Sequence, residues 1–255
     1  GFLLTTLSDV NNEIFNIICF LWGAVAILAF ILLQFVTAPY GRHIETGWGP
    51  EVSNRLGWIL MEIPSFAIIL FFFVTSNQSL YASVLSILWL IHYLNRTFVF
   101  PFRLRTKGKK MPLVIVGSAI FFNFFNAGLN GYFLADMEQY KNINFTEWNF
   151  FAGFTIFVIA FVLNQLSDST LIKLRQPGET GYKITFGYLF NYVSCPNHLT
   201  EFLQWTGFAL MAWNLPALTF LMWTAANLFP RAMKHHKWYK NNFDNYPKDR
   251  KAIIP

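Results

Sequence analysis

The chain has 255 residues, of which 55% are hydrophobic, 19% aromatic and 13% charged. Soluble domains carry about 25% charged residues, and the thirty phenylalanines would be hard to bury in one water-soluble core. The formal net charge is +6, but a nucleic-acid binder presents its basic face on a soluble domain, so this composition argues against that class and indicates a polytopic membrane protein.

Hydrophobic stretches recur along the whole chain. A helix that crosses a bilayer needs about 20 mostly apolar residues. Seven stretches are candidates, and the last two are separated by the break WNLP: 13–36, 56–75, 80–101, 112–134, 148–172, 198–213 and 215–231. Because no internal repeat, low-complexity tract or long linker interrupts them, we expect an all-α fold with seven transmembrane helices in a single domain, residues 1–255.

The charges of the connecting segments orient these helices, because Lys and Arg collect on the cytoplasmic side of a membrane. Residues 103–110 hold five basic residues and no acid, and the tail from Arg231 holds seven Lys or Arg against two Asp. Residues 135–148 hold three acids and one lysine, and the N-terminal segment has Asp9 and Glu13 without a base. We therefore expect the N-terminus outside and the C-terminus in the cytoplasm. Residues 103–110 are interpreted mainly as this topological signal, with phosphate binding as the lesser alternative.

Polar side chains inside the predicted helices share one depth. When each helix is followed in its direction of travel, most of them fall in the cytoplasmic half: Glu62, His92, Tyr93, Asn95, Arg96, Asn164, Asp168, Asn197, Glu201, Gln204, Arg231 and His235. A charge at mid-membrane depth costs roughly 2.5 to 3.5 kcal/mol on insertion scales and by default indicates function. Three pairs have the i and i+4 spacing of one helix face: Asn164 and Asp168, Asn197 and Glu201, Arg231 and His235. We therefore predict a polar cavity open to the cytoplasm.

Three asparagines of the fourth predicted helix, Asn123, Asn126 and Asn130, run from mid-depth towards the outer side. Asparagine in a transmembrane helix commonly forms hydrogen bonds with a neighbouring helix and so holds the packing together. We prefer that interpretation for each of them. For Glu62, Asp168, Glu201 and Arg231 together we prefer a functional site.

The chemistry of the predicted cavity follows from what it contains. The sequence has no HExxH or CxxC metal signature, no GxGxxG or Walker loop and no GxSxG motif, so no metal site is expected. Burial favours the neutral form of Glu62, and a neutral acid with a tyrosine can hydrogen-bond a carbonyl and stabilise an enolate. Basic residues on the wet side can hold phosphates. The pattern predicts an apolar carbonyl substrate from the lipid and a phosphorylated cofactor from the cytoplasm.

Six segments are shared with a known family: PYGRH (39–43), MEIPSF (61–66), HYLNRTFVFP (92–101), NQLSDSTLIKLRQPGETGYKI (164–184), FNYVSCPNHLTEFLQWTGFAL (190–210) and RAMKHHKWYKNNFDNYPKDRKAIIP (231–255). In order and spacing they resemble the steroid 5-alpha-reductase family of membrane enzymes, and the chain looks like a bacterial member. The resemblance covers all but the first predicted helix.

The resemblance implies reduction of the carbon–carbon double bond of a 3-oxo-Δ4 steroid with NADPH as the cofactor. Hydride would reach the β-carbon of the enone and a proton the α-carbon, while Glu62 and Tyr93 hold the carbonyl oxygen. Trp58, Met61 and Arg96 are implied as lining of the substrate pocket. The cofactor residues that it implies are Asn164, Asp168, Arg175, Tyr182, Asn197, Glu201, Arg231, His235 and Tyr239.

The sequence departs from the family in one place and leaves alternatives open. Met61 stands where many members have a glutamine, which removes one hydrogen bond to the substrate. VSCPN (193–197) is similar to the enoyl-thioester reductase branch, so a long-chain 2-enoyl thioester is an alternative substrate. A membrane methyltransferase using S-adenosylmethionine is disfavoured because CPNH (195–198) stands where those enzymes have RHP. A transporter or receptor is disfavoured because the outer half is poor in ionisable groups.

The expected partners are a hydrophobic steroid or lipid substrate that enters from the bilayer, and the membrane lipids themselves. No nucleic-acid partner is expected, and the chain is expected to act as a monomer. The expected location is the bacterial cytoplasmic membrane, or the endoplasmic reticulum membrane if the source is eukaryotic.

Overall fold

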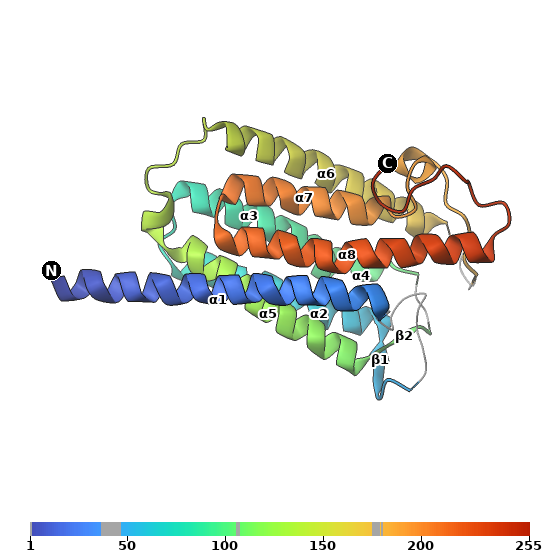
Figure 1. Ribbon diagram of the computed structural model, residues 1–255, viewed down its shortest axis with the longest axis horizontal. Coiled ribbons are helices and arrows are strands. Elements are labelled where there is room, and N and C mark those ends of the chain that lie inside the picture. The colour runs from blue at the N-terminus through green and yellow to red at the C-terminus, as the bar shows by residue number, and fades with distance from the viewer. Residues whose placement is uncertain (1, 37–46, 106–107, 175–178, 180) are drawn as a thin grey trace.

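The computed structural model describes residues 2–36, 47–105, 108–174, 179 and 181–255. In these ranges the chain is mostly helical, and its long helices run along a common axis, with the N-terminus at one end and the C-terminal tail at the other (Figure 1). The helices are α1 Phe2–Phe35, α2 Asn54–Thr75, α3 Leu80–Leu94, α4 Phe100–Arg103, α5 Leu113–Ala135, α6 Trp148–Lys173, α7 Pro196–Ala212 and α8 Leu215–Asn242; a π-helical turn, Asn95–Val99, joins α3 to α4, and 3₁₀ turns lie at Met137–Tyr140 and Tyr188–Asn191.

Five helical segments of the described chain are long and apolar enough to cross a membrane: Asn11–Phe35, Asn54–Thr75, Leu80–Arg103, Leu113–Ala135 and Trp148–Lys173. They correspond to the first five predicted spans. Helix α7 has only 17 residues, and the apolar part of α8 is interrupted by Asn227, Pro230 and Arg231. The mostly helical fold is therefore confirmed, whereas the sixth and seventh spans and the orientation of the termini stay predictions.

The expectation of a purely α-helical chain misses one small sheet. Strand β1, Glu51–Ser53, pairs antiparallel with β2, Lys110–Pro112. Each strand has three residues, which is too short for an alternating hydrophobic pattern to appear in the sequence. Because β1 leads directly into α2 and β2 into α5, the pair brings the first turns of these two helices together.

Aromatic side chains make up much of the core between α3, α7 and α8. The Trp205 ring lies 5.0 Å from that of Trp89 and 4.4 Å from that of Phe220. Helix α1 lies alongside α8 (Figure 1). There the rings of Trp22 and Trp223 are 4.8 Å apart, and the Trp223 indole N–H donates to the Trp22 carbonyl at 3.1 Å.

Two of the three asparagines of α5 hold helices together, as predicted. The Asn123 amide nitrogen donates to the Met61 carbonyl of α2 at 2.6 Å. The Asn130 amide nitrogen donates to the Pro216 carbonyl of α8 at 3.3 Å. Asn126 is also fully buried, but its side-chain amide has no hydrogen-bond partner within the described ranges. The packing interpretation is thus confirmed for Asn123 and Asn130.

The C-terminal tail folds back onto the segment that precedes α7. The Lys251 N–H donates to the Tyr192 carbonyl at 2.9 Å, and the Ser194 N–H donates to the Lys251 carbonyl at 2.9 Å. The Ser194 hydroxyl lies 2.6 Å from His236 Nδ1 and 2.5 Å from the Tyr246 hydroxyl. Burial and neighbouring positive charges lower the pKa of His236, which favours the neutral ring in this network. The tail therefore braces the loop that leads into α7.

Candidate active site

A π-helical turn places Arg96. In this turn the Phe100 N–H bonds to the Asn95 carbonyl, five residues back instead of four. Pro101 follows and has no N–H to continue the α-helical ladder, which accounts for the change of geometry at this point. π-Helical turns inside α-helices occur frequently at functional sites. Here the turn carries Arg96, whose guanidinium is directed towards α2 and α6.

Arg96 brings together acidic side chains from three other helices. Its Nη2 atom lies 3.7 Å from Glu62 Oε1 of α2, and its Nη1 atom lies 3.8 Å from Asp168 Oδ2 of α6. The side chains of Arg96, Glu62 and Asp168 are 11%, 13% and 6% exposed. Glu201 of α7 is the charge that acts most strongly on Arg96. The convergence predicted from depth is therefore observed for these four residues.

Aromatic rings hold the Arg96 guanidinium from its apolar side. Its central carbon lies 5.0 Å from the centre of the Trp58 ring and 4.6 Å from that of Phe100. The two rings meet edge to face at 5.6 Å. A cation over an aromatic face is stabilised by the ring quadrupole, more so when it is desolvated. Trp58 and Phe100 therefore both contact Arg96, while the predicted role of Trp58 in the substrate pocket stays a prediction.

Tyr93 lies on α3 one turn before Arg96 and is 4% exposed. Its ring stacks on Trp89 at 5.4 Å with an interplanar angle of 26°. Tyr93 and Arg96 are three residues apart and so lie near each other on the helix surface, and Arg96 contacts Glu62. The structure therefore brings together the two residues that the resemblance assigns to the substrate carbonyl. Next to them, His92 Nδ1 lies 3.2 Å from Gln204 Oε1.

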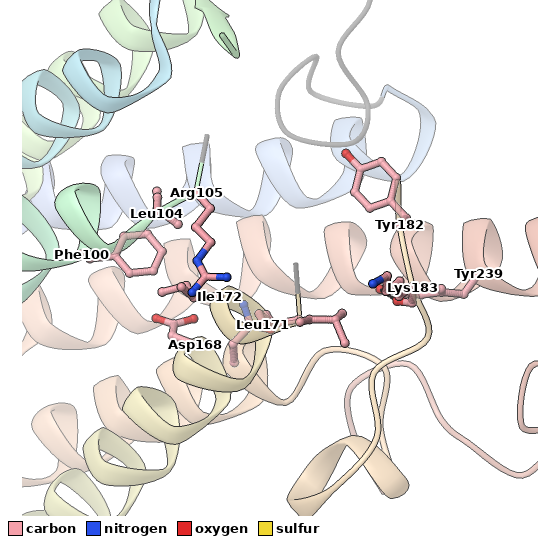
Figure 2. A pocket seen from close by; sticks show the side chains of 11 residues that line it. Phe100, Leu104, Arg105, Asp168, Leu171, Ile172, Tyr182, Lys183 and Tyr239 are labelled. Atoms are coloured by element: carbon pink, nitrogen blue, oxygen red, sulfur yellow. Dashed lines mark hydrogen bonds between the residues drawn. The ribbon is translucent and has the colours of Figure 1, made fainter. Parts of the chain in front are cut away.

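A hollow of about 220 Å³ opens beside this cluster at the C-terminal end of the bundle, and Figure 2 shows its lining. Four predicted cofactor residues line it: Asp168, Tyr182, Asn197 and Tyr239. Its other lining residues are Phe100, Leu104, Arg105, Leu171, Ile172, Leu174 and Lys183. Asp168 also contacts Arg96, so this hollow and the Glu62–Tyr93 pair lie on two sides of one buried ion-pair cluster.

Other predicted cofactor residues lie outside this lining. The Asn164 amide nitrogen donates to the Asn197 carbonyl at 2.9 Å, which ties α6 to α7. Arg231 and His235 lie on α8 and do not line the hollow, and the His235 ring is 5.8 Å from that of His198. Arg175 lies outside the described residues.

Met61 occupies different surroundings from Glu62, its neighbour in the chain. Its side chain is buried in an apolar cluster with Met111 and Val116, between α2 and the start of α5. Consecutive residues of a helix point about 100° apart, and only Glu62 faces Arg96. The structure therefore places the Met61 side chain in packing between α2 and α5.

Sequence reasoning missed two basic residues of the hollow. Arg105 belongs to the segment 103–110 that was interpreted mainly as a topological signal. Lys183 lies in the quoted motif GYKI but was not assigned a role. Both side chains line the hollow, so the alternative of phosphate binding deserves more weight for Arg105. Lys183 could have been found from the sequence, because it lies in a segment shared with the family, whereas Arg105 lies outside those segments.

Known proteins are similar to this chain over most of its length. A model of the family described as 3-oxo-5-alpha-steroid 4-dehydrogenase matches residues 109–255. Steroid 5-alpha-reductase DET2 of Gossypium hirsutum is 40% identical over 239 residues, covering 91% of this chain and 92% of the relative. 3-Oxo-5-alpha-steroid 4-dehydrogenase 1 of Rattus norvegicus is 37% identical over 244 residues, with 94% of each covered. The Homo sapiens protein of that name is 33% identical over 257 residues, with 99% of each covered.

Five helical segments of the described chain that are long and apolar enough to cross a bilayer indicate an integral membrane protein. The extent and identity of the matches make the assignment more specific. The chain belongs to the steroid 5-alpha-reductase family, oxidoreductases that act on CH–CH groups. The resemblance stated from the sequence segments is thereby confirmed.

Proposed function

We propose that this chain reduces the Δ4 double bond of a 3-oxo-Δ4 steroid with NADPH and releases the 5α-reduced steroid. One observation carries the proposal. Arg96 contacts Glu62 on one side and Asp168 on the other, so a carbonyl-binding pair lies directly beside a hollow suited to a nucleotide. The reducing group and the enone would therefore meet within one buried cluster.

The lining of the hollow fits part of a phosphorylated dinucleotide. Arg105 and Lys183 can pair with phosphates, and Tyr182 and Tyr239 offer aromatic faces. A volume of about 220 Å³ is below the roughly 300–1,000 Å³ of a complete small-molecule site, so it accommodates one portion of such a cofactor. When bound, NADPH supplies the hydride for the β-carbon of the enone.

The residues on the other side of Arg96 would act on the substrate carbonyl. Tyr93 and a neutral Glu62 donate hydrogen bonds to the carbonyl oxygen, which gains negative charge as the β-carbon is reduced. Donors placed in advance at such an oxygen are worth roughly 10²–10³ in kcat each. A proton then reaches the α-carbon, so that one hydride and one proton are added across the double bond. Arg96, held by Trp58 and Phe100, fixes the orientation of the Glu62 carboxyl.

The proposal includes the arrangement in the membrane. We place seven helices across the bilayer, with the basic C-terminal end of the bundle in the cytoplasm. NADPH then enters from the cytoplasm and the steroid from the lipid, and the chain works as a monomer. The location follows the source: the cytoplasmic membrane in a bacterium, or the endoplasmic reticulum in a eukaryote.

A direct assay tests the proposal. Purified protein in lipid nanodiscs is incubated with testosterone or progesterone and NADPH, and the steroids are separated by liquid chromatography and mass spectrometry. We expect a 5α-reduced product with matching loss of NADPH absorbance. A parallel reaction with a long-chain 2-enoyl thioester, which presents the same conjugated carbonyl, distinguishes the alternative substrate. Turnover of the thioester without turnover of either steroid would overturn the steroid assignment.

A further inference from the structure

A second arginine, Arg103 at the end of α4, also reaches α6. Its Nη1 atom donates to Gln165 Oε1 at 3.4 Å, and its Nη2 atom donates to Ser169 Oγ at 2.6 Å. The backbones of α4 and α6 do not pack closely within the described ranges. The long side chain of Arg103 therefore spans the space between these two helices.

The direction of each hydrogen bond in this contact follows from the groups involved. An arginine can only donate, so the amide oxygen of Gln165 and the hydroxyl oxygen of Ser169 both accept. The single proton of the Ser169 hydroxyl goes to the Gln165 backbone carbonyl at 2.6 Å. Gln165 and Ser169 are four residues apart and lie on one face of α6. The planar guanidinium thus holds both ends of one helical turn.

The helix α4 is held from α2 by another arginine. The Arg55 Nε atom donates to the Pro101 carbonyl at 3.3 Å, and the Arg55 guanidinium lies 5.3 Å from the centre of the Phe102 ring. Helix α4 has only four residues, and a helix this short is not stabilised by its own hydrogen bonds. Its position therefore depends on side chains such as Arg55 and Arg103 that attach it to its neighbours.

The hollow lies between the two elements that Arg103 joins (Figure 2). One part of its lining belongs to α4 and the residue pair that follows it: Phe100, Leu104 and Arg105. Another part belongs to α6: Asp168, Leu171 and Ile172. Arg103 itself does not belong to the lining. A side chain outside the hollow thus connects two of its walls.

We propose that Arg103 is a positioning residue that holds α4 against α6 and thereby places Arg105 for contact with the cofactor. The proposal rests on the proposed function, because it takes the hollow as part of the NADPH site. Arg103 does not touch NADPH and acts through the wall that carries Leu104 and Arg105. The shape of the guanidinium matters here, because lysine is a single point charge without the rigid fork.

The first experiment separates the shape of Arg103 from its charge. NADPH affinity is measured by NADPH fluorescence in lipid nanodiscs, without steroid, for the unaltered protein, Arg103→Gln and Arg103→Lys. We expect Arg103→Gln to weaken NADPH about tenfold, the loss of one charge-assisted hydrogen bond from a misplaced Arg105. Arg103→Lys keeps the charge but not the fork, so most of this loss should remain. Full affinity in Arg103→Lys would overturn the proposal, because the charge alone would then be sufficient.

The second experiment removes the partner of Arg103 on α6. Ser169→Ala is compared with Thr170→Val, a matched control in the next position, whose hydroxyl donates to the Leu166 carbonyl at 2.8 Å as that of Ser169 does to the Gln165 carbonyl. Each variant loses one hydroxyl that bonds back within α6, but Ser169 also accepts from Arg103.

We expect Ser169→Ala to weaken NADPH severalfold and Thr170→Val to stay within about twofold of the unaltered protein, as surface substitutions commonly do. The thermal midpoints of the two variants should be similar. The value of kcat at saturating NADPH and the KM for steroid should not change in either. In the Arg103→Gln background Ser169→Ala should cause no further loss, since residues that form one contact are not additive.

Three results would overturn the proposal. Equal NADPH affinities in Ser169→Ala and Thr170→Val, or additive losses in the double variant, would leave the contact without a role in cofactor binding. A loss in Arg103→Gln with none in Ser169→Ala would make Arg103 a direct ligand of the cofactor. If Arg103→Gln does not fold, the comparison of Ser169→Ala with Thr170→Val still decides.

Failure of the proposed function gives a different result. If the unaltered protein binds NADPH but reduces no steroid, the function is wrong, and the NADPH affinities of the variants still decide the role of Arg103. If the unaltered protein does not bind NADPH, both proposals are wrong.

Discussion

The Arg96 guanidinium lies among three acids, Glu62, Asp168 and Glu201. Arg103 adds a weaker positive influence on Asp168. Burial disfavours the charged form of a carboxyl group, and the Glu62 side chain is only 13% exposed. We therefore expect Glu62 to be neutral in the free protein, which is also the form that can donate a hydrogen bond to a carbonyl.

At this residue scale, Glu62→Gln and Tyr93→Phe test the carbonyl-binding pair. Glutamine keeps the shape and hydrogen bonding of Glu62 but removes the acidic proton, and phenylalanine removes the tyrosine hydroxyl. We expect kcat for a 3-oxo-Δ4 steroid to fall roughly 10²–10³-fold in each variant, with NADPH binding retained. Steady-state kinetics and NADPH fluorescence measure the two effects, with Glu51→Gln as an exposed control. Near-normal turnover of Glu62→Gln would rule out a requirement for the carboxyl proton.

Arg105 and Arg231 are alternative candidates for binding the phosphates of the cofactor. The family resemblance assigns Arg231, whereas the structure places Arg105 in the lining of the hollow. A charge-assisted hydrogen bond contributes about 1.5–3 kcal/mol, so Arg105→Ala should raise the KM for NADPH about tenfold or more. We expect a smaller rise from Arg231→Ala and little change of kcat in either. If Arg231→Ala has the larger effect, the dinucleotide phosphates lie nearer α8 than we propose.

At the scale of helices, the distance between α6 and α7 sets the width of the cofactor side. These helices touch through two glycines. A Cβ atom at Gly153 would lie 2.5 Å from the Gly207 carbonyl oxygen, and one at Gly207 would lie 2.5 Å from the Gly153 carbonyl oxygen. Backbone atoms cannot move aside as a flexible side chain can. Because α6 carries Asp168 and α7 carries Asn197, a change in the spacing of these two helices would also move the two lining residues.

Gly153→Ala or Gly207→Ala should force α6 and α7 apart. Overpacking typically costs about 1–3 kcal/mol, and we expect the thermal midpoint to fall clearly and the KM for NADPH to rise. Gly128→Ala in α5 is the matched control, because a Cβ there meets nothing within 4 Å. Thermal unfolding of the three variants in the same nanodiscs gives the comparison. A midpoint unchanged in Gly153→Ala and Gly207→Ala would show that the helices do not approach this closely.

At the scale of the molecule, the sequence predicts much of the fold because the bilayer imposes simple requirements. Helix positions follow from the length of apolar stretches, and the break WNLP separates α7 from α8 as expected. The meeting of Glu62, Arg96 and Asp168 could be predicted from their shared depth, since an ionisable group in a membrane faces the protein interior.

Other features depend on contacts between distant residues and could not be predicted. The β1–β2 pair rests on backbone hydrogen bonds between 51–53 and 110–112, which leave no mark in three-residue strands. The side chain of Met61 packs on Met111 and Val116. Which face of α2 turns towards α5 decides this contact. The Ser65 hydroxyl of α2 donates a hydrogen bond to Asn123 of α5. A contact between two distant helices cannot be seen in a single sequence.

The seven-helix topology predicts that two exposed lysines lie on opposite sides of the membrane. Lys141 follows α5 and Lys248 lies in the C-terminal tail, and both are exposed. A single cysteine introduced at Lys141 should react with an impermeant maleimide on intact cells, whereas one at Lys248 should react only after permeabilisation. The native Cys19 and Cys195 are buried and give the background. Labelling of both positions from the same side would contradict the three spans that this topology places between Lys141 and Lys248.

The central claim is that hydride is added to the β-carbon of a 3-oxo-Δ4 steroid at the site formed by Glu62 and Tyr93. Its most direct test uses testosterone and NADPH that carries deuterium at the transferred position, followed by mass spectrometry and NMR of the product. We predict a 5α-reduced steroid with one deuterium at C5 and an intact 3-oxo group. Deuterium at C3, from reduction of the carbonyl itself, or the absence of any reduced steroid would contradict the account.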